Sequence, residues 1–152
     1  MSDTATHVES MAIHPNTLRL LGGPGVVVQP KRSATGPVRA LVLKYRAVER
    51  LSAFLKASPP QLMRVIEVNE RTAQRRKEQG ALTAEESDRL ARVARITRRA
   101  VDAFGDEDQA REWLQRPNRA LRGALPLELL GTDAGAELVS DELGRIEYGV
   151  LY

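Results

Sequence analysis

The sequence contains no cysteine and is only 4% aromatic. The missing cysteine excludes a disulfide framework, a thiol nucleophile and any metal site that needs thiolate ligands. Because 42% of the residues are hydrophobic, a buried core is feasible, but it has to be built from Leu, Val, Ile and Ala. This composition favours packed helices over a β-sandwich, and 152 residues allow one ordinary domain or two very small ones.

Long apolar runs are also absent, since none approaches the roughly 20 residues that span a bilayer. The segment MSDTATHVES at the start has neither the basic residues nor the apolar stretch of a signal peptide. We therefore expect a soluble, cytoplasmic protein.

Residues suited to catalysis are few. The two histidines, His7 and His14, lie in a segment that we expect to be irregular, where a flexible base is poorly placed for proton transfer. The stretch Gly22–Gly25 lacks the Lys-Ser/Thr ending of a phosphate-binding loop, and the acidic residues of the last third accompany no recognisable partner motif. We expect a binding protein that is not an enzyme and that holds no metal or cofactor.

The net charge of +3 conceals an uneven distribution. Residues 39–100 carry 15 basic and 7 acidic side chains, a net charge of +8. Residues 101–152 carry 5 basic and 11 acidic side chains, a net charge of −6, and residues 1–38 contribute +1. This asymmetry suggests two surfaces with two different partners. The basic middle attracts phosphate, whereas the acidic end repels it.

The N-terminal segment differs in character from the rest of the chain. Gly and Pro are dense in GGPG at 22–25 and in QPKRSATGP at 29–37, which opposes a long helix. We expect residues 1–37 to form a largely irregular arm. Val26 to Val28 are a candidate edge strand that could pair with a second copy of the chain.

From Val38 onwards, hydrophobic residues recur every three or four positions, which is the period of a helix. This spacing predicts a first helix over residues 38–56. Its buried face is expected to be Leu41, Tyr45, Val48, Leu51 and Leu55.

Capping residues predict where the next helices begin and end. Ser58 before a proline predicts the start of a second helix, expected to bury Leu62, Val65 and Ile66, and Asn69 predicts the start of a third. The third is expected to end at Gly80. Thr83 and Glu86 form a capping box for a fourth helix. The expected buried face of the fourth helix is Leu90, Val93, Ala94, Thr97, Ala100, Val101 and Phe104.

Shorter helices are predicted beyond Gly105, beginning near Asp106, Pro126 and Asp133. Their inward-facing residues are expected to be Ala110, Trp113, Leu114, Val139, Leu143 and Ile146. The predicted fold class is therefore all-α. Its expected divisions are an arm over residues 1–37, a helix-turn-helix domain over 38–104 and a C-terminal domain over 105–152.

The second and third helices have the dimensions of a helix-turn-helix, in which the second helix of the motif lies in the major groove of DNA. The third helix carries a polar stripe whose Arg and Gln side chains suit guanine and adenine edges. The candidate DNA-binding residues are Thr72, Gln74, Arg75, Arg76, Lys77 and Gln79. The alternative is a solvated charged face, because many short basic helices never touch DNA.

A second basic series lies on the fourth helix, where it alternates with the buried positions and is expected to point outward. It consists of Arg89, Arg92, Arg95, Arg98 and Arg99. Its simplest role is solubility and pairing with nearby carboxylates, and the alternative is contact with phosphate or an acidic partner.

The end of the chain is apolar, which is unusual because chain ends are commonly frayed and polar. The segment from Tyr148 to Tyr152 follows an amphipathic helix, and we expect it to pack either on its own domain or in a partner's cleft. Trp113, the sole tryptophan, suits core packing.

Residues 46–152 resemble the Xre/MbcA/ParS family of antitoxins, the partners of RES-domain toxins. In the first half the resemblance rests on RTAQRRK at 71–77, LTAEESDRL at 82–90 and Arg92. In the second half it rests on AREWL at 110–114, PNRAL at 117–121, Gly123, PLELL at 126–130, Gly135 and RIEYGV at 145–150. The ordered run of motifs from 113 to 149 is the specific part, and residues 57–68 match more loosely.

The resemblance implies an Xre-like helix-turn-helix bundle followed by a small helical toxin-binding domain. It implies an antitoxin that binds its own operator as an autorepressor and neutralises a NAD-consuming toxin by covering the toxin's active site. The toxin-binding candidates are Trp113, Arg145, Tyr148, Gly149, Val150, Leu151 and Tyr152. We expect a homodimer, as for other helix-turn-helix proteins. The alternative is a transcriptional regulator whose C-terminal half only dimerises.

Overall fold

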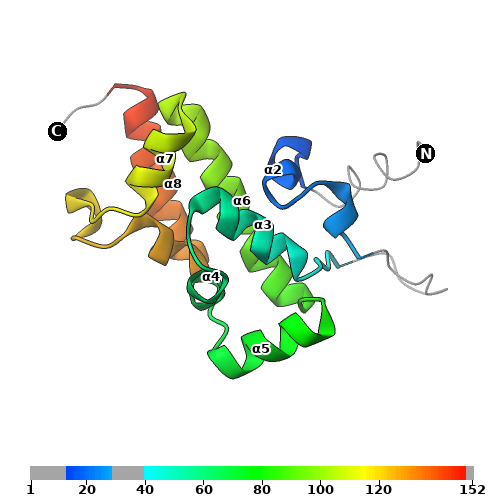
Figure 1. Ribbon diagram of the computed structural model, residues 1–152. Helices are drawn as coiled ribbons and strands as arrows, with labels where there is room; N and C mark the ends of the chain where they lie inside the picture. The colour runs from blue at the N-terminus through cyan, green and yellow to red at the C-terminus, as the bar shows by residue number, and fades with distance from the viewer. Residues whose placement is uncertain (1–12, 29–39, 150–152) are drawn as a thin grey trace.

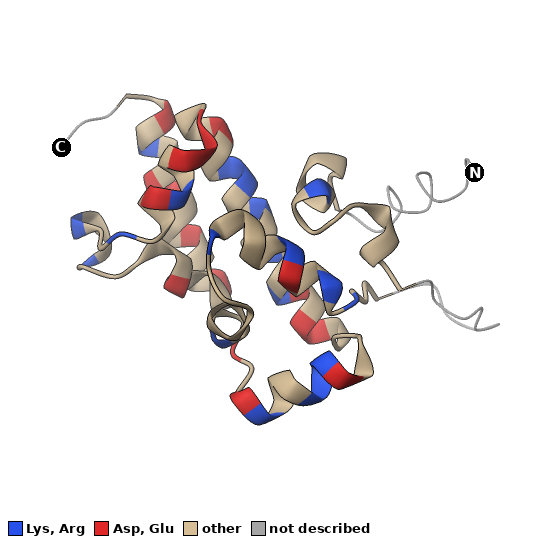
Figure 2. Ribbon diagram, in the orientation of Figure 1, with Lys and Arg blue, Asp and Glu red and all other residues tan. Residues whose placement is uncertain are grey.

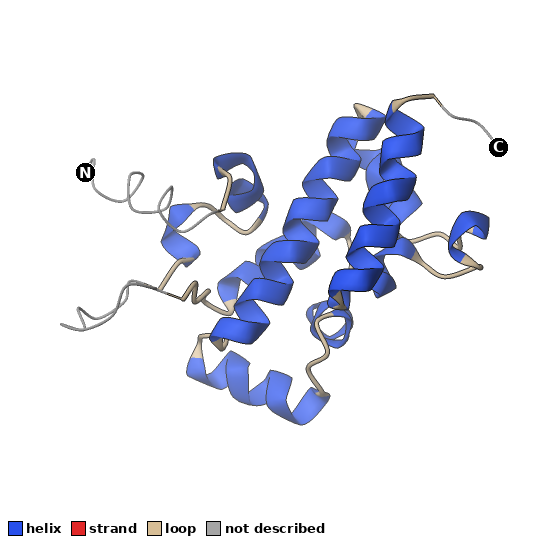
Figure 3. Ribbon diagram, turned by 180° about the vertical axis from the view of Figure 1, so that it is seen from behind, coloured by secondary structure: helices blue, strands red, loops and turns tan. Residues whose placement is uncertain are grey.

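The computed structural model describes residues 13–28 and 40–149, and these residues form helices joined by short turns (Figure 1). The elements are α2 (Pro15–Leu20), the 3-10 helix η1 (Pro24–Val26), α3 (Arg46–Leu55), α4 (Pro59–Val65), α5 (Glu70–Gln79), α6 (Ala84–Phe104), α7 (Glu107–Leu114), the 3-10 helices η2 (Arg119–Leu121) and η3 (Pro126–Gly131), and α8 (Asp133–Glu147). Two isolated β-bridges occur, and the described part contains no β-strand (Figure 3). The predicted all-α class is confirmed.

The predicted capping residues act as expected. The Ser58 hydroxyl accepts the N–H of Gln61, the third residue of α4, and the Asn69 side chain accepts the Thr72 N–H at 2.9 Å. Thr83 and Glu86 form the complete capping box of α6. These contacts satisfy backbone N–H groups that have no partner inside their own helix, so the helix-turn-helix region follows its local sequence signals.

The first predicted helix begins later than expected. Residues before Arg46 are extended, with Leu43 in an antiparallel bridge to Val27 and Lys44 in one to Ala81. Leu41, Leu43 and Tyr45 are buried while the residues between them are not, which is the alternation of an extended chain. The prediction of a helix from residue 38 was therefore wrong for this stretch.

Residues 13–28 also differ from the irregular arm that we expected. They form α2 and η1, and α2 buries Thr17 and Leu18 beside α6. His14 caps α2, since its Nδ1 accepts the Asn16 N–H at 3.2 Å. The candidate strand around Val27 pairs with a segment of the same chain. Residues 1–12 and 29–37 of the arm lie outside the described residues.

Helix α6 is the central element, because α2, α7, η3 and α8 all pack on it (Figures 1 and 3). Most of its predicted buried face is buried, and so is Ile96, which the prediction omitted. Val101 and Phe104, which were expected in the core, are only partly buried. The 21 residues of α6 thus support both the helix-turn-helix and the C-terminal helices.

The C-terminal helices are docked directly on the helix-turn-helix region. A Cβ atom on Gly131 of η3 would lie 2.1 Å from the Val65 carbonyl oxygen of α4, so only glycine permits this approach. Arg92 spans the same junction, since it donates to the Gly131 carbonyl at 3.1 Å and pairs with Asp133 at 2.5 Å. Arg92 is therefore not an outward-pointing member of the basic series, contrary to expectation.

A second junction joins α7 to the end of α3. Arg111 donates to the Phe54 carbonyl at 3.2 Å, and its guanidinium lies 5.2 Å from the centre of the Phe54 ring. Gln115 donates to the Leu55 carbonyl at 2.5 Å. Carbonyls at the end of α3 thereby gain partners from the C-terminal half.

Candidate DNA-binding and toxin-binding surfaces

Helices α4 and α5 form the helix-turn-helix, and α5 is its outer helix. The turn between them is tight, with Glu67 in the left-handed region at φ +64°. No side chain of α5 is fully buried, and the helix lies at the edge of the molecule (Figure 1). This helix can therefore approach a large partner such as a DNA groove without rearrangement of the core.

The structure exposes most of the predicted DNA-binding side chains. Gln74, Arg75, Lys77 and Gln79 are exposed, and Thr72 is partly buried. Within residues 13–28 and 40–149, neither Arg75 nor Lys77 forms an ion pair. Their charges are therefore available to an anionic partner.

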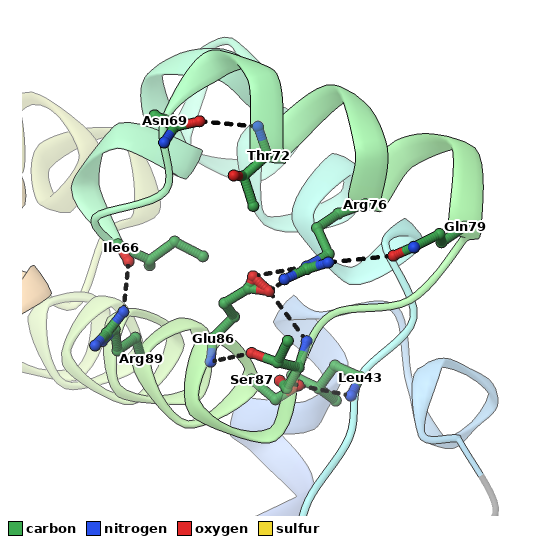
Figure 4. A network of polar contacts seen from close by, with 10 residues as sticks. Leu43, Ile66, Asn69, Thr72, Arg76, Gln79, Glu86, Ser87 and Arg89 are labelled. Carbon is green, nitrogen blue, oxygen red and sulfur yellow. Dashed lines mark hydrogen bonds and ion pairs between the residues drawn. The ribbon is translucent and has the colours of Figure 1, made fainter.

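Arg76 differs from its neighbours on α5, because its side chain turns inward. Its Nε lies 2.5 and 2.9 Å from the two carboxylate oxygens of Glu86, at the start of α6 (Figure 4). The side chains of Arg76 and Glu86 are only 14% and 7% exposed. Arg76 also donates to the Gln79 side chain at 3.2 Å. Its guanidinium is thus occupied within the protein, which differs from the outward position that the sequence suggested.

Glu86 joins two parts of the helix-turn-helix domain. One of its oxygens accepts the Thr83 N–H, which completes the capping box, while the same carboxylate pairs with Arg76. Burial by itself raises the pKa of the Glu86 carboxyl, but hydrogen bonds from Arg76 and Thr83 and the charge of Arg76 lower it below the ordinary value. The carboxylate form, which is the form that holds α5, is therefore favoured.

Two further basic residues lie beside α5 and were not among the predicted DNA-binding residues. Lys44 and Arg46 are exposed, and they flank Tyr45, whose N–H donates to the Gly80 carbonyl at the end of α5. The backbone next to Lys44 and Arg46 is thereby joined to the end of α5, and Figure 2 shows Lys and Arg positions in blue on both α3 and α5. No sequence pattern indicates this proximity, because it depends on a backbone contact between residues 35 positions apart.

The C-terminal surface is formed by α8 and the residue that caps it. Arg145 is exposed and pairs with Glu142 at 2.9 Å, and Tyr148 and Gly149 are exposed at the helix end. Trp113 is different, since it is partly buried and its ring lies 5.8 Å from that of Phe104. This position agrees with core packing.

The remaining toxin-binding candidates, Val150, Leu151 and Tyr152, lie outside the described residues.

None of the helices in the described part combines the length and the apolar character that a membrane span requires. In that same part, no three His, Asp or Glu side chains are grouped so that they could hold a metal ion.

Two family models match consecutive parts of the chain. Residues 38–95 match the antitoxin Xre-like helix-turn-helix domain, and residues 99–149 match the antitoxin Xre/MbcA/ParS C-terminal toxin-binding domain. A protein of Photorhabdus laumondii named antitoxin Xre is 34% identical over 125 residues, which cover 78% of this chain and 84% of the relative. The chain belongs to the Xre/MbcA/ParS antitoxin family.

Other members of the family are similar over shorter ranges. An antitoxin Xre of Yersinia enterocolitica is 40% identical over 103 residues, covering 65% of this chain and 70% of the relative. One of Pseudomonas putida is 40% identical over 68 residues, covering 45% of this chain and 43% of the relative. The family assignment identifies an antitoxin with a DNA-binding and a toxin-binding half, and it points to a regulator rather than an enzyme.

Proposed function

We propose that this antitoxin neutralises a RES-domain toxin that consumes NAD and represses its own operon in the cytoplasm. The observation that carries the proposal is that two separate surfaces are joined by one helix, α6. Helix α5 pairs with its start through Arg76 and Glu86, and α8 packs along it. A basic surface at α5 suits operator DNA, and α8 with its acidic exposed side chains suits a toxin. The two family models divide along the same helix, α6.

On the toxin side, α8 ends at Glu147, is capped by Tyr148 and is followed by residues 149–152. We infer that Arg145, Tyr148 and this tail cover the NAD cleft of the toxin. A cleft that binds a dinucleotide phosphate is basic, and the acidic C-terminal half of the antitoxin complements it. Trp113 lies on α7 and packs this helix on α6 through its contact with Phe104.

On the DNA side, we infer that α5 enters the major groove with Thr72, Gln74, Arg75, Lys77 and Gln79 toward the bases and phosphates. Arg76 contributes by holding α5 rather than by reading a base. Helix-turn-helix proteins bind palindromic operators as two-fold dimers, so we propose that the antitoxin is a homodimer.

Coexpression tests the toxin half of the proposal. The RES-domain reading frame beside this gene is induced in bacteria with and without the antitoxin, and cellular NAD and growth are followed. We expect NAD to fall and growth to stop in the absence of the antitoxin, and both to recover in its presence. A harmless neighbour, or a loss of NAD that the antitoxin does not prevent, would refute this half.

Operator binding tests the DNA half, using the promoter region of the operon and the double variant Arg75→Ala/Lys77→Ala. Loss of two phosphate contacts in each protomer removes four from the proposed dimer, which lowers the slope of log K against log salt by about 3.6 in magnitude. The matched control is Arg119→Ala/Arg122→Ala, which removes two exposed charges from the C-terminal half. An unchanged slope for the α5 variant would remove α5 from the DNA interface.

A further inference from the structure

Among the described residues, two large hydrophobic side chains are exposed, one within α8 and one at its C-cap. Leu138 lies in α8 and is 56% exposed, and Tyr148 caps α8 and is 85% exposed. Tyr148 is one of the predicted toxin-binding residues, whereas Leu138 is not among them. Complete burial of a leucine side chain contributes about 1.5–3 kcal/mol of free energy relative to leaving it in water. An exposed leucine on a regular helix can therefore contribute to the binding of a partner that covers it.

Most exposed residues of α8, together with Tyr148, form one continuous stripe, which we call the α8 outer stripe. Its members recur at helical spacing along one side of the helix. They are Ala134, Glu137, Leu138, Asp141, Arg145 and Tyr148. The opposite side of α8, which includes Val139 and Leu143, is buried against the core. The stripe is thus a rigid surface, because the opposite side of α8 is packed on the core.

A hollow of about 370 Å³ lies beside the C-terminal end of the stripe, between α6 and α8. Asp141 and Tyr148 line it together with Gly144 and, from α6, Arg99. A Cβ atom at Gly144 would lie 3.4 Å from the Arg99 guanidinium, which is van der Waals contact. The surface therefore combines projecting side chains with a shallow recess that is open to solvent.

The charge of the stripe indicates what kind of surface it fits. Glu137 and Asp141 are exposed and form no ion pair within residues 13–28 and 40–149. A complementary surface has an apolar pocket for Leu138 and a basic rim for the two carboxylates. A second copy of the chain paired about Leu138 fits poorly, because this two-fold arrangement brings the Glu137 and Asp141 carboxylates of the two copies close together.

We propose that the α8 outer stripe is the surface on which the toxin docks, with Leu138 as its apolar anchor. The stripe lies inside residues 99–149, the part that matches a toxin-binding domain, and it leads to Tyr148. This inference rests on the proposed toxin binding and deepens it. Docking along α8 would position Tyr148 and the residues that follow it at the toxin cleft. Leu138 and Tyr148 would then contact the toxin at two different points along α8.

The test measures the affinity of the full-length antitoxin for the purified RES-domain protein encoded beside it. A buried anchor residue at an interface contributes enough that Leu138→Ala weakens binding by roughly tenfold, and Leu138→Asp by roughly 100-fold or more. Because Leu138 is exposed, we expect operator binding and the thermal unfolding temperature to remain unchanged. Toxin affinity equal to that of the unmodified chain in Leu138→Asp would overturn the proposal.

A charge-reversal pair provides the matched control. Asp141→Lys lies on the stripe, whereas Glu128→Lys makes the same change in charge on η3, beside α4. We expect the first to weaken toxin binding by roughly tenfold and the second to leave it unchanged. Equal effects of the two would mean that net charge, and not the stripe, sets affinity.

Two other outcomes have separate meanings. If Leu138→Asp converts a dimer to a monomer in light scattering while toxin affinity is retained, the stripe is a contact between copies and the proposal is wrong. If the unmodified antitoxin does not bind the RES-domain protein at all, the proposed function fails, and the docking surface fails with it.

Discussion

Replacing Arg76 with alanine removes the only ion pair that the structure places between α5 and the start of α6 within the described residues. The change leaves the Glu86 carboxylate largely buried with only the capping-box bonds from Thr83. Loss of a charged hydrogen bond at such a site costs about 1–3 kcal/mol, below the cost for a fully buried pair because both groups retain some solvent. Because no side chain of α5 is fully buried, the lost free energy mainly weakens the packing of α5 against the rest of the domain.

Amide hydrogen exchange measures the docking directly and does not depend on finding the operator. A loss of 1–3 kcal/mol raises the opening equilibrium of α5, so we expect its amides to exchange roughly 5 to 150 times faster in Arg76→Ala. Amides of α8 should be unaffected. We expect operator affinity to fall only in proportion to the loss of molecules in which α5 is docked. The slope of log K against log salt should equal that of the unmodified chain.

Glu86→Ala provides the decisive comparison. A carboxylate near DNA opposes binding, so its removal would strengthen operator binding if Glu86 acted only through charge. We expect faster exchange in α5 instead, as in Arg76→Ala. The double variant should be little worse than either single one, with a coupling free energy of about 1–3 kcal/mol. Additive effects in this cycle, or unchanged exchange in α5, would show that Arg76 does not position the helix.

Other predictions concern stability. Gly135→Ala should cost more than about 3 kcal/mol in denaturant unfolding, because its Cβ would lie 1.9 Å from a carbonyl oxygen, whereas Gly144→Ala should stabilise α8 by about 0.5–1 kcal/mol. Ser87→Ala should cost about 1–3 kcal/mol, since the buried Ser87 hydroxyl accepts a backbone N–H at 2.9 Å. The lowered pKa of Glu86 stabilises the fold above the ordinary value of 4.5, so the advantage of the unmodified chain over Glu86→Gln should shrink as pH falls below that value; an advantage independent of pH would contradict this assignment.

Helix boundaries set by local contacts were predictable from the sequence. Ser58, Asn69 and Thr83 each accept a hydrogen bond from the N–H three residues further on, so their signals lie within a few positions of the chain. The start of the first helix was not predictable in this way. Leu41 and Tyr45 fit both a helical and an extended period, and the choice was made by bridges to residues far along the chain.

The candidate surfaces show the same difference between features set by local sequence and features set by contacts between distant residues. Exposure of Arg75 and Lys77 follows from the helical pattern alone, and the structure agrees with it. The inward turn of Arg76 depends on Glu86, ten residues away across a turn between two helices, and no periodicity encodes that pairing. Leu138 sits next to the buried Val139 in sequence, so its exposure was readable from the helical period, but an exposed leucine gains meaning only when its neighbours in space are known.

The continuity of α6 has a consequence for how such antitoxins can diversify. Its first half carries the helix-turn-helix and its second half carries α7 and α8, with no linker where one module ends and the other begins. A recombination breakpoint inside this rod would have to preserve two sets of core contacts, including the close approach at Gly131. Exchange of whole C-terminal modules between lineages is therefore costly, and under the proposed docking on α8 new toxin specificities are reached more readily by point changes on the exposed side of this helix.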